Sequence, residues 1–428
     1  MAVTWFRKLG NQAPVPVFPL VGKNGEAALE ALHLSPAVTI VQSPKQARAL
    51  AVLGCIDHQD QPAFRRVHDQ VPAPRVTGWC STMALPKELS DTAVVVASAD
   101  QLGTQVQQAV HALDAGQRRS DPNLCPDEPP APWKGVGDGH GGEGMMGGKP
   151  YGRPMAMPED DLRDGLQLDP LAFSFGPFSS LLPPGMVAKV RLHGDVIAGW
   201  EIASQPYELT LPSVFFQALE QPVAIEELEL ARAAFHLRRL AGALQVNGLG
   251  AHARRLRHKV AGLTCGQTLT EVANAHILES LRWVAGADKG VVHHESQVRL
   301  RGPAARATGD PRDARLNDPA YAALGFEPVV QQQGNCAARW KQWRDEAGQA
   351  LALAAAAAET QAMSSPYGAV ESPVGELTTS TPPADISDLL PSMLIGLEWS
   401  EAMSVLASLD VPAVRYADVM QVQGGGAL

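Results

Sequence analysis

A proline- and glycine-rich segment, about residues 118–165, constrains the fold of this 428-residue chain more than any other feature. Runs such as DPNLCPDEPPAPWKG cannot sustain a helix or a strand, because proline removes a backbone donor and glycine costs backbone entropy. We therefore expect a connector between an N-terminal domain, residues 1–117, and a C-terminal domain, residues 166–428. A chain of this length has room for more than one domain.

The N-terminal domain alternates strand-like and helix-like runs. Strands are predicted where β-branched residues gather, at 37–41, 49–54, 74–79 and 92–98. Helical spacing is found at 61–71, at 99–116, and at 43–49, where Ser43 would be the N-cap and Pro44 the first helical residue. This alternation predicts an α/β domain with an open parallel sheet.

The C-terminal domain is predicted to be mainly α, with a β-hairpin at its start. In residues 186–202, Val187, Lys189 and Arg191 alternate with Ala188, Val190 and Leu192, and residues 193–195 form the turn. Apolar residues at helical spacing then predict helices at 224–250, 268–286 and 337–363, and a closing helix pair within 385–410.

Charge and cysteine usage exclude some classes of protein. The net charge of −10 argues against a nucleic-acid binder, which needs a basic face to displace counterions from phosphate. The longest apolar stretch, residues 350–358, is about half of what a bilayer-spanning helix needs. Five scattered cysteines without a CxxC pair predict reduced thiols rather than disulfides or an all-cysteine metal site.

Residues 43–81 resemble the cluster-bearing small subunit shared by respiratory complex I and nickel–iron hydrogenases. The likeness rests on Ser43–Ala47, on Asp69–Pro74, and on Gly78 and Cys80. In that family the small subunit holds a 4Fe–4S cluster on four cysteines. Cys80 alone occupies one of those ligand positions here, so we expect neither the cluster nor any other metal.

Residues 299–326 resemble the large subunit of the same superfamily, as do GAVESPVGEL (368–377) and the closing helices. Arg306, Asp313 and Arg315 fall in register with the family motif, and we expect them to form a structural ion-pair network rather than a catalytic set. The two subunits, normally separate chains, would be fused here in the order small, then large.

The resemblance also implies where cofactors would bind. Hydrogenase nickel needs two CxxC pairs in the large subunit, which the sequence lacks. Complex I binds a quinone headgroup between the two subunits, with a histidine in the first hairpin and a tyrosine shortly after it. Gly176-Pro177-Phe178 lacks that histidine, while Tyr207 lies within one residue of the expected tyrosine. Cys80 and Tyr207 are therefore remnants of cofactor-binding positions, and no catalytic residue is predicted.

Three other features leave alternatives open. His293-His294-Glu295 could ligate a metal or could be solvated polar residues. The arginines within 235–259 could form an electrostatic docking face or ordinary solvated helix faces. The glycine-rich stretch 135–154 holds His140, Met145, Met146 and Tyr151, and we expect an ordered loop that covers the domain junction or meets a partner rather than a plain tether.

These observations favour a peripheral, cofactor-less scaffold or coupling subunit of a membrane-bound, complex I-like assembly that translocates ions. Its expected partners are antiporter-type membrane subunits and other peripheral-arm subunits, on the cytoplasmic face of the membrane. One alternative is a redox-active subunit of the NADH–quinone oxidoreductase or hydrogenase type, with a degenerate quinone pocket or a cluster completed by a partner chain. Another is a free-standing small-molecule binder.

Overall fold

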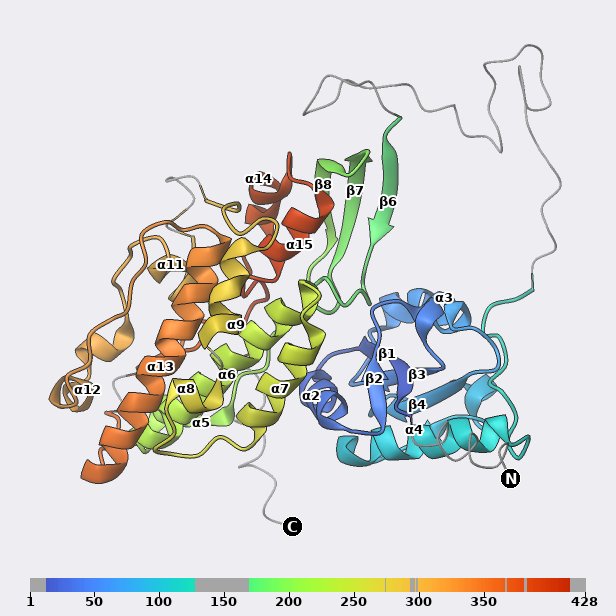
Figure 1. The fold of residues 1–428 in the computed structure, drawn as a ribbon, viewed down its shortest axis with the longest axis horizontal. Helices are drawn as coiled ribbons and strands as arrows, with labels where there is room; N and C mark the ends of the chain where they lie inside the picture. Colours follow the sequence, from blue (N-terminus) through green and yellow to red (C-terminus); the bar gives the residue numbers. More distant parts are fainter. Residues whose placement is uncertain are drawn as a thin grey trace.

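The computed structural model describes residues 13–127, 169–273, 275–292, 297, 299–365, 368–380 and 383–415. Within these residues the chain forms an α/β body followed by a mainly helical body, which lie side by side (Figure 1). The predicted layout of a parallel α/β part and a mainly α part is confirmed at this level.

The α/β body is built on a five-stranded parallel sheet. Its strands are β1 (Val15–Val21), β2 (Val38–Ile40), β3 (Ala49–Leu53), β4 (Val76–Cys80) and β5 (Val94–Val95). The order across the sheet is β2-β1-β3-β4-β5, and every pair is parallel. All five residues of the central strand β3 are buried, as expected for a strand covered on both faces.

Helices cover both faces of this sheet. Helices α2 (Glu26–Leu34) and α4 (Ala99–Asp114) share one apolar cluster with Val17 and Val76. Helix α3 (Gln61–Gln70) contributes Phe64 to a second cluster, with Leu50 and Trp79. Residues after α4 continue along the same body, since buried Leu124 belongs to the second cluster.

The predicted helix at 43–49 is wrong. The structure has only a short 3-10 turn, Pro44–Gln46, and the Ser43 side chain does not cap it. Ala47 takes an extended backbone conformation, and the Arg48 amide donates to the carbonyl of Pro16 on β1. Pairing with β1 therefore overrides the helical preference of this segment.

The helical body opens with a three-stranded antiparallel sheet, in the order β6-β7-β8. Its strands are β6 (Leu171–Phe175), β7 (Val187–His193) and β8 (Val196–Ser204). The predicted hairpin corresponds to β7 and β8, and Lys189 and Arg191 are exposed while Ala188 and Val190 are buried. The apolar face of β7 packs on the main core of the helical body.

The longer helices are α5 (Ser213–Glu220), α6 (Ile225–Val246), α7 (Gly250–Ala261), α13 (Cys336–Thr360) and α15 (Trp399–Leu406). Shorter ones are α8 (Leu269–Val272), α9 (Ala275–Ser280), α11 (Gly302–Arg306), α12 (Pro319–Ala323) and α14 (Leu390–Leu394). A small hairpin joins β9 (Ala369–Ser372) to β10 (Gly375–Thr378). Helices α6 and α13 pack against each other at the centre of this body. The predicted apolar stripe of α6 is buried at every position, Ile225, Leu228, Ala233, Leu237, Leu240 and Leu244.

The predicted helix over 268–286 is wrong as a continuous element. Ala273 is extended and buried, and it ends α8. Beyond α9, a 3-10 turn, η5 (Leu281–Trp283), leads to Gly286, whose φ of +80° ends the helical run. None of the described helices has the length and apolarity to cross a bilayer.

Candidate functional site

The carboxyl edge of the parallel sheet faces the helical body between β1 and β3. In the strand order β2-β1-β3-β4-β5, the chain connections diverge at these two strands, and open parallel sheets bind their ligands at that point. The loops that would form the crevice are 22–25, after β1, and 54–60, after β3. The fold therefore favours a binding site at this edge of the sheet.

Backbone contacts close this crevice from within. The Lys23 amide donates to the carbonyl of Cys55 at 2.7 Å, and the Cys55 amide donates to the carbonyl of Lys23 at 2.9 Å. Gly54, with a φ of +74°, lies between them, and a Cβ there would be 2.3 Å from the Lys23 carbonyl oxygen. The two loops therefore leave no room between them for even a methyl group at this point.

Tyr207 of the helical body covers what remains of the crevice. Its phenolic oxygen donates to Asp60 Oδ2 at 2.6 Å, and both residues are 6% exposed. The Lys23 ammonium lies 5.7 Å from the centre of the Tyr207 ring. Gly185, with a φ of +83°, packs against the ring, where a Cβ would be 2.5 Å from the nearest ring atom. Tyr207 is therefore held on several sides.

The electrostatics of this pair keep the phenol protonated. Burial, and then the hydrogen bond to Asp60, raise the pKa of Tyr207 well above its usual value. Burial also raises the pKa of Asp60, the bond from Tyr207 lowers it, and nearby Asp57 adds to the rise. Lys23 pairs with Asp57 at 2.9 Å at the rim. The Tyr207 phenol of the helical body therefore donates a hydrogen bond to the Asp60 carboxyl group of the α/β body.

Further contacts join the two bodies around this pair. Phe178, between β6 and β7, is buried in the second apolar cluster of the α/β body. Asn24 Oδ1 accepts a hydrogen bond from Thr210 at 3.3 Å and one from Arg415 at 2.8 Å. Figure 1 shows α2 against α7, where Arg257 pairs with Glu30. The junction is therefore packed and ion-paired rather than open.

Cys80, the predicted remnant of a cluster ligand, ends β4 at the same edge of the sheet. It is half-buried, and burial raises the pKa of its thiol. Cys55 follows the neighbouring strand β3 and is also half-buried. Cys125 lies near α3, where its amide donates to Asp69, and Cys265 and Cys336 belong to the helical body. Five free cysteines distributed in this way do not supply the four converging thiolates of a 4Fe–4S cluster.

In the described part of the chain, His, Cys, Asp and Glu side chains do not gather in groups of three or more that could hold a metal ion. His293-His294-Glu295 lies outside the described residues, as do His140, Met145, Met146 and Tyr151. The expectations for these residues stay predictions.

A second cluster of buried charges lies in the centre of the helical body and contains Arg306, Asp313 and Arg315. Arg306 on α11 contacts Asp313 at 3.2 Å, and Asp313 contacts Arg315 at 2.8 Å. Arg306 also pairs with Glu346 on α13 and with Glu371 on β9, each at 2.7 Å. The three residues singled out in the sequence therefore lie together, and all are 5% exposed or less.

Helix α6 completes this cluster with Glu229, Arg232 and His236. Glu229 pairs with Arg232 at 3.1 Å and with Arg315 at 3.2 Å, and it accepts a 2.6 Å hydrogen bond from the Tyr321 phenol. His236 Nε2 lies 3.2 Å from Glu346 Oε2. The cluster thus links α6, α11, α13, β9 and the turn η6 (Ala314–Asn317).

The carboxyl groups of the cluster differ in acidity. Burial would raise the pKa of Asp313, but Arg315 and Arg306 outweigh it and lower that pKa. Arg306 and His236 likewise hold the pKa of Glu346 well below its usual range against burial. Burial and the negative Asp313 raise the pKa of Glu371 in spite of Arg306. Among Asp313, Glu346 and Glu371, only Glu371 has a raised pKa, so it is the most readily protonated of these three carboxyls.

The arginine side chains between residues 235 and 259 differ in the contacts that they make. Arg239 pairs with Asp410 at 2.7 Å, and Arg254 donates to the carbonyl of Val38 at 3.2 Å. With the Arg257–Glu30 pair, these residues make contacts within and between the two bodies, whereas Arg255 and Lys259 are exposed. Arg239, Arg254 and Arg257 therefore make contacts of the fold, and the docking face stays a prediction.

Sequence reasoning missed Asp60, Glu229, Glu346 and Glu371. A usable signal existed for Glu229, because it shares the buried face of α6 with Arg232 and His236 at positions i, i+3 and i+7. Chemically, the junction can bind the two bodies together, and the buried cluster can fix five elements of the helical body.

No protein-family model matches the chain, and no curated protein matches it.

Proposed function

We propose that this chain is a peripheral, cofactor-less scaffold or coupling subunit of a membrane-bound, complex I-like assembly that translocates ions. The observation that carries the proposal is the Tyr207–Asp60 hydrogen bond. It places a side chain of the second body in the crevice where an open parallel sheet would otherwise take a ligand. A junction filled in this way transmits force between two bodies and does not hold a headgroup between them.

The order of the two bodies supports the same proposal. A parallel α/β body with the small-subunit-like motif precedes a hairpin and helical body with the large-subunit-like motifs. Those large-subunit-like motifs supply Arg306, Asp313, Arg315 and Glu371 to one buried cluster. The residues that carry the resemblance therefore support the fold of the helical body and its rigidity.

The proposed partners are antiporter-type membrane subunits and other peripheral-arm subunits, with the chain on the cytoplasmic face of the membrane. In this proposal, coupling acts through contact and charge, and the buried Tyr207–Asp60 bond and the Arg257–Glu30 pair between the two bodies support it. A rigid body is suited to this task, since a small displacement at one surface reaches the other surface instead of being absorbed.

Co-purification from native membranes tests the proposal. A tagged full-length chain is extracted with a mild detergent, and its partners are identified by mass spectrometry after size-exclusion chromatography. We expect antiporter-type membrane subunits to co-elute in comparable amounts. Elution as a lone chain, without membrane proteins, would contradict the proposal.

Iron and acid-labile sulfide measured in the same anaerobic preparation separate the proposal from the redox alternative. We expect neither above the background of a mock preparation. Near-stoichiometric iron with sulfide in the chain itself would favour the redox subunit and overturn the cofactor-less scaffold.

A further inference from the structure

Helix α7 carries positive charge in a chain that is negative as a whole. The chain has 45 acidic residues among 428, yet none of them lies between Glu229 and Glu271. Helix α7 belongs to this stretch, and its sequence GAHARRLRHKVA holds three arginines and one lysine. In a chain of net charge −10, this helix therefore has a local charge opposite to that of the whole molecule.

The cations of α7 are divided between two faces of the helix. The inner face is buried, and its one cation, Arg257, pairs with Glu30 on α2. Four consecutive or one-turn neighbours are exposed, and we call them the basic face of α7: Arg254, Arg255, His258 and Lys259. Residues with this spacing lie on the same side of a helix, so their side chains are available to one partner.

Contacts of the fold leave the basic face without a counter-charge. Arg254 donates to the backbone carbonyl of Val38 at 3.2 Å, which satisfies a donor but supplies no carboxylate. Arg255 and Lys259 form no ion pair with the acidic side chains that the structure describes. These two residues are four positions apart, where like charges weaken a helix. The basic face therefore costs the fold some stability without a return inside it, which is typical of a binding surface.

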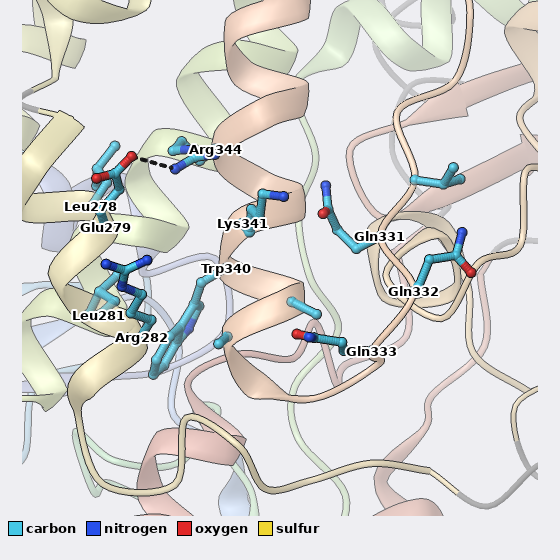
Figure 2. Close-up of a pocket in the computed structure, with 13 residues that line it drawn as sticks. Leu278, Glu279, Leu281, Arg282, Gln331, Gln332, Gln333, Trp340, Lys341 and Arg344 are labelled. Carbon is cyan, nitrogen blue, oxygen red and sulfur yellow. Dashed lines mark ion pairs between the residues drawn. The ribbon is translucent and has the colours of Figure 1, made fainter.

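The exposed cations Arg282 and Lys341 are arranged differently. They lie around the pocket between α9 and α13, where the neighbouring Arg344 contacts Glu279 at 3.7 Å. Figure 2 shows Lys341 directed toward Gln331 and away from Arg282. These two side chains do not share a surface, so they provide a matched control for the basic face of α7.

The basic face lies beside the boundary between the two bodies. Helix α7 packs against α2 of the α/β body (Figure 1). The contact of Arg254 reaches Val38, which is on β2 of that same body. A partner seated on the basic face would therefore lie next to both bodies.

We propose that the basic face of α7 binds an acidic segment of a partner protein, with carboxylates at Arg254, Arg255 and Lys259. The inference rests on the proposed function, because the partner would be another peripheral-arm subunit of the assembly. Charge complementarity favours such a segment, since arginine and lysine form charge-assisted hydrogen bonds with carboxylates.

Two observations favour a protein segment over an anionic membrane. The apolar residues of α7, such as Leu256 and Val260, are buried, so the basic face has no apolar side chain to insert among lipids. The row of cations is also only one helix wide. A flat anionic surface would meet the negatively charged remainder of the chain as well, whereas a narrow segment would not.

Peptide binding to the full-length chain tests the proposal directly. Fluorescein-labelled hexaglutamate is titrated by fluorescence anisotropy at low ionic strength. Vesicles of phosphatidylcholine with phosphatidylglycerol are tested in parallel by co-sedimentation. The α7 variant is Arg255→Gln with Lys259→Gln, and the control is Arg282→Gln with Lys341→Gln, which changes the net charge equally at exposed positions.

We expect hexaglutamate to bind the wild type and the α7 variant to bind it about tenfold more weakly, because two charge-assisted contacts are lost. The control should change binding by less than about twofold, since isolated exposed charges contribute weakly. Thermal melting of the α7 variant should be unchanged or slightly raised, because the like-charge pair is removed. Lower binding with an intact fold therefore reports on the surface itself.

Three results of these titrations would overturn the proposal. One is failure of hexaglutamate to bind the wild type. Another is equal weakening by the α7 variant and the control, which would show general attraction to positive charge. The third is binding to the phosphatidylglycerol vesicles alone, weakened in the α7 variant, which would assign the basic face to an anionic membrane.

Co-purification from native membranes separates this inference from the proposed function. We expect the α7 variant to lose a peripheral-arm subunit that the wild type and the control retain. If the wild type and the α7 variant retain the same partners, the docking inference fails while the proposed function stands. If the wild type elutes alone, the proposed function fails, and the hexaglutamate titration still decides whether the basic face binds an acidic segment.

Discussion

The Tyr207 phenol donates a 2.6 Å hydrogen bond to Asp60, a residue 147 positions earlier in the chain. The bond joins the loop after β8 to the loop after β3, so it crosses from the helical body to the α/β body. Both groups are buried, and each is the polar partner that makes burial of the other tolerable. The junction therefore depends on both members.

Replacing Tyr207 with phenylalanine should destabilise the protein by about 1–3 kcal/mol at neutral pH, because it leaves the Asp60 carboxylate buried without its donor. Urea unfolding followed by circular dichroism measures this loss. Asp60→Asn is the matched variant, since an amide oxygen can still accept from the phenol, and its loss should be smaller. A larger loss in Asp60→Asn than in Tyr207→Phe would show that the charge on Asp60, and not the hydrogen bond, holds the junction.

Within the buried cluster, Glu346→Gln should cost more stability than Glu371→Gln. Glu346 accepts from Arg306 Nε at 2.7 Å and from Arg306 Nη2 at 3.0 Å, and a glutamine amide would face one of these donors with its own. Loss of one partner from a buried ion pair costs about 3–5 kcal/mol. Glu371 is the more readily protonated carboxyl of the cluster, so removal of its charge costs less. Chemical denaturation of the two variants at neutral pH checks this order, which the reverse ranking would contradict.

The same cluster gives a pH dependence with a definite sign. Glu371 has a folded-state pKa above its ordinary value of 4.5, so its contribution to stability is full below that value and is lost as pH rises through the raised pKa. Asp313 and Glu346 have lowered pKa values, so their contributions are full above the ordinary carboxyl range and are lost as pH falls.

Glu371→Gln removes the first of these dependences, which is the one that falls above pH 4.5. The free energy of unfolding of the variant, relative to the wild type, should therefore rise as pH increases from about 4.5 to neutral. Denaturation at several pH values between these limits measures the difference. A constant difference across this range would mean that Glu371 is ionised throughout in the folded protein.

Periodicity predicted much of the fold, and its failures have physical causes. The stripe on α6 and the alternation on β7 are buried as expected, because each element packs one face on the core. Strand β1 was not among the predicted strands, since Pro16 and Pro19 lack the amide that a central strand normally uses. Residues 43–49 and 268–286 have helical spacing, but pairing with β1 and the extended Ala273 override it.

The site was less accessible to sequence reasoning. Tyr207 could be selected from the motif resemblance, but its partner Asp60 depends on how two bodies dock. Arg306, Asp313 and Arg315 lie close in sequence, so their grouping could be predicted. Their partners Glu346 and Glu371 come from α13 and β9, and only the tertiary fold brings them within 2.7 Å.

Closure of the crevice between β1 and β3 can be tested with a single methyl group. Gly54→Ala should destabilise the protein strongly, because the residue has a φ of +74° and its new Cβ would lie 2.3 Å from the Lys23 carbonyl oxygen and 2.7 Å from the Gly25 amide nitrogen. Gly116→Ala is the matched control, since Gly116 has a φ of +71° and nothing lies within 4 Å of the added Cβ.

The control should lose about 1–2 kcal/mol from the left-handed backbone alone. Gly54→Ala should lose at least about 2 kcal/mol more from overpacking against the backbone of the opposite loop. Unfolding free energies of the two variants isolate this difference. Equal losses would mean that the loops after β1 and β3 separate easily and that the crevice can open to a ligand. Such an opening would remove the main support for a scaffold without a cofactor.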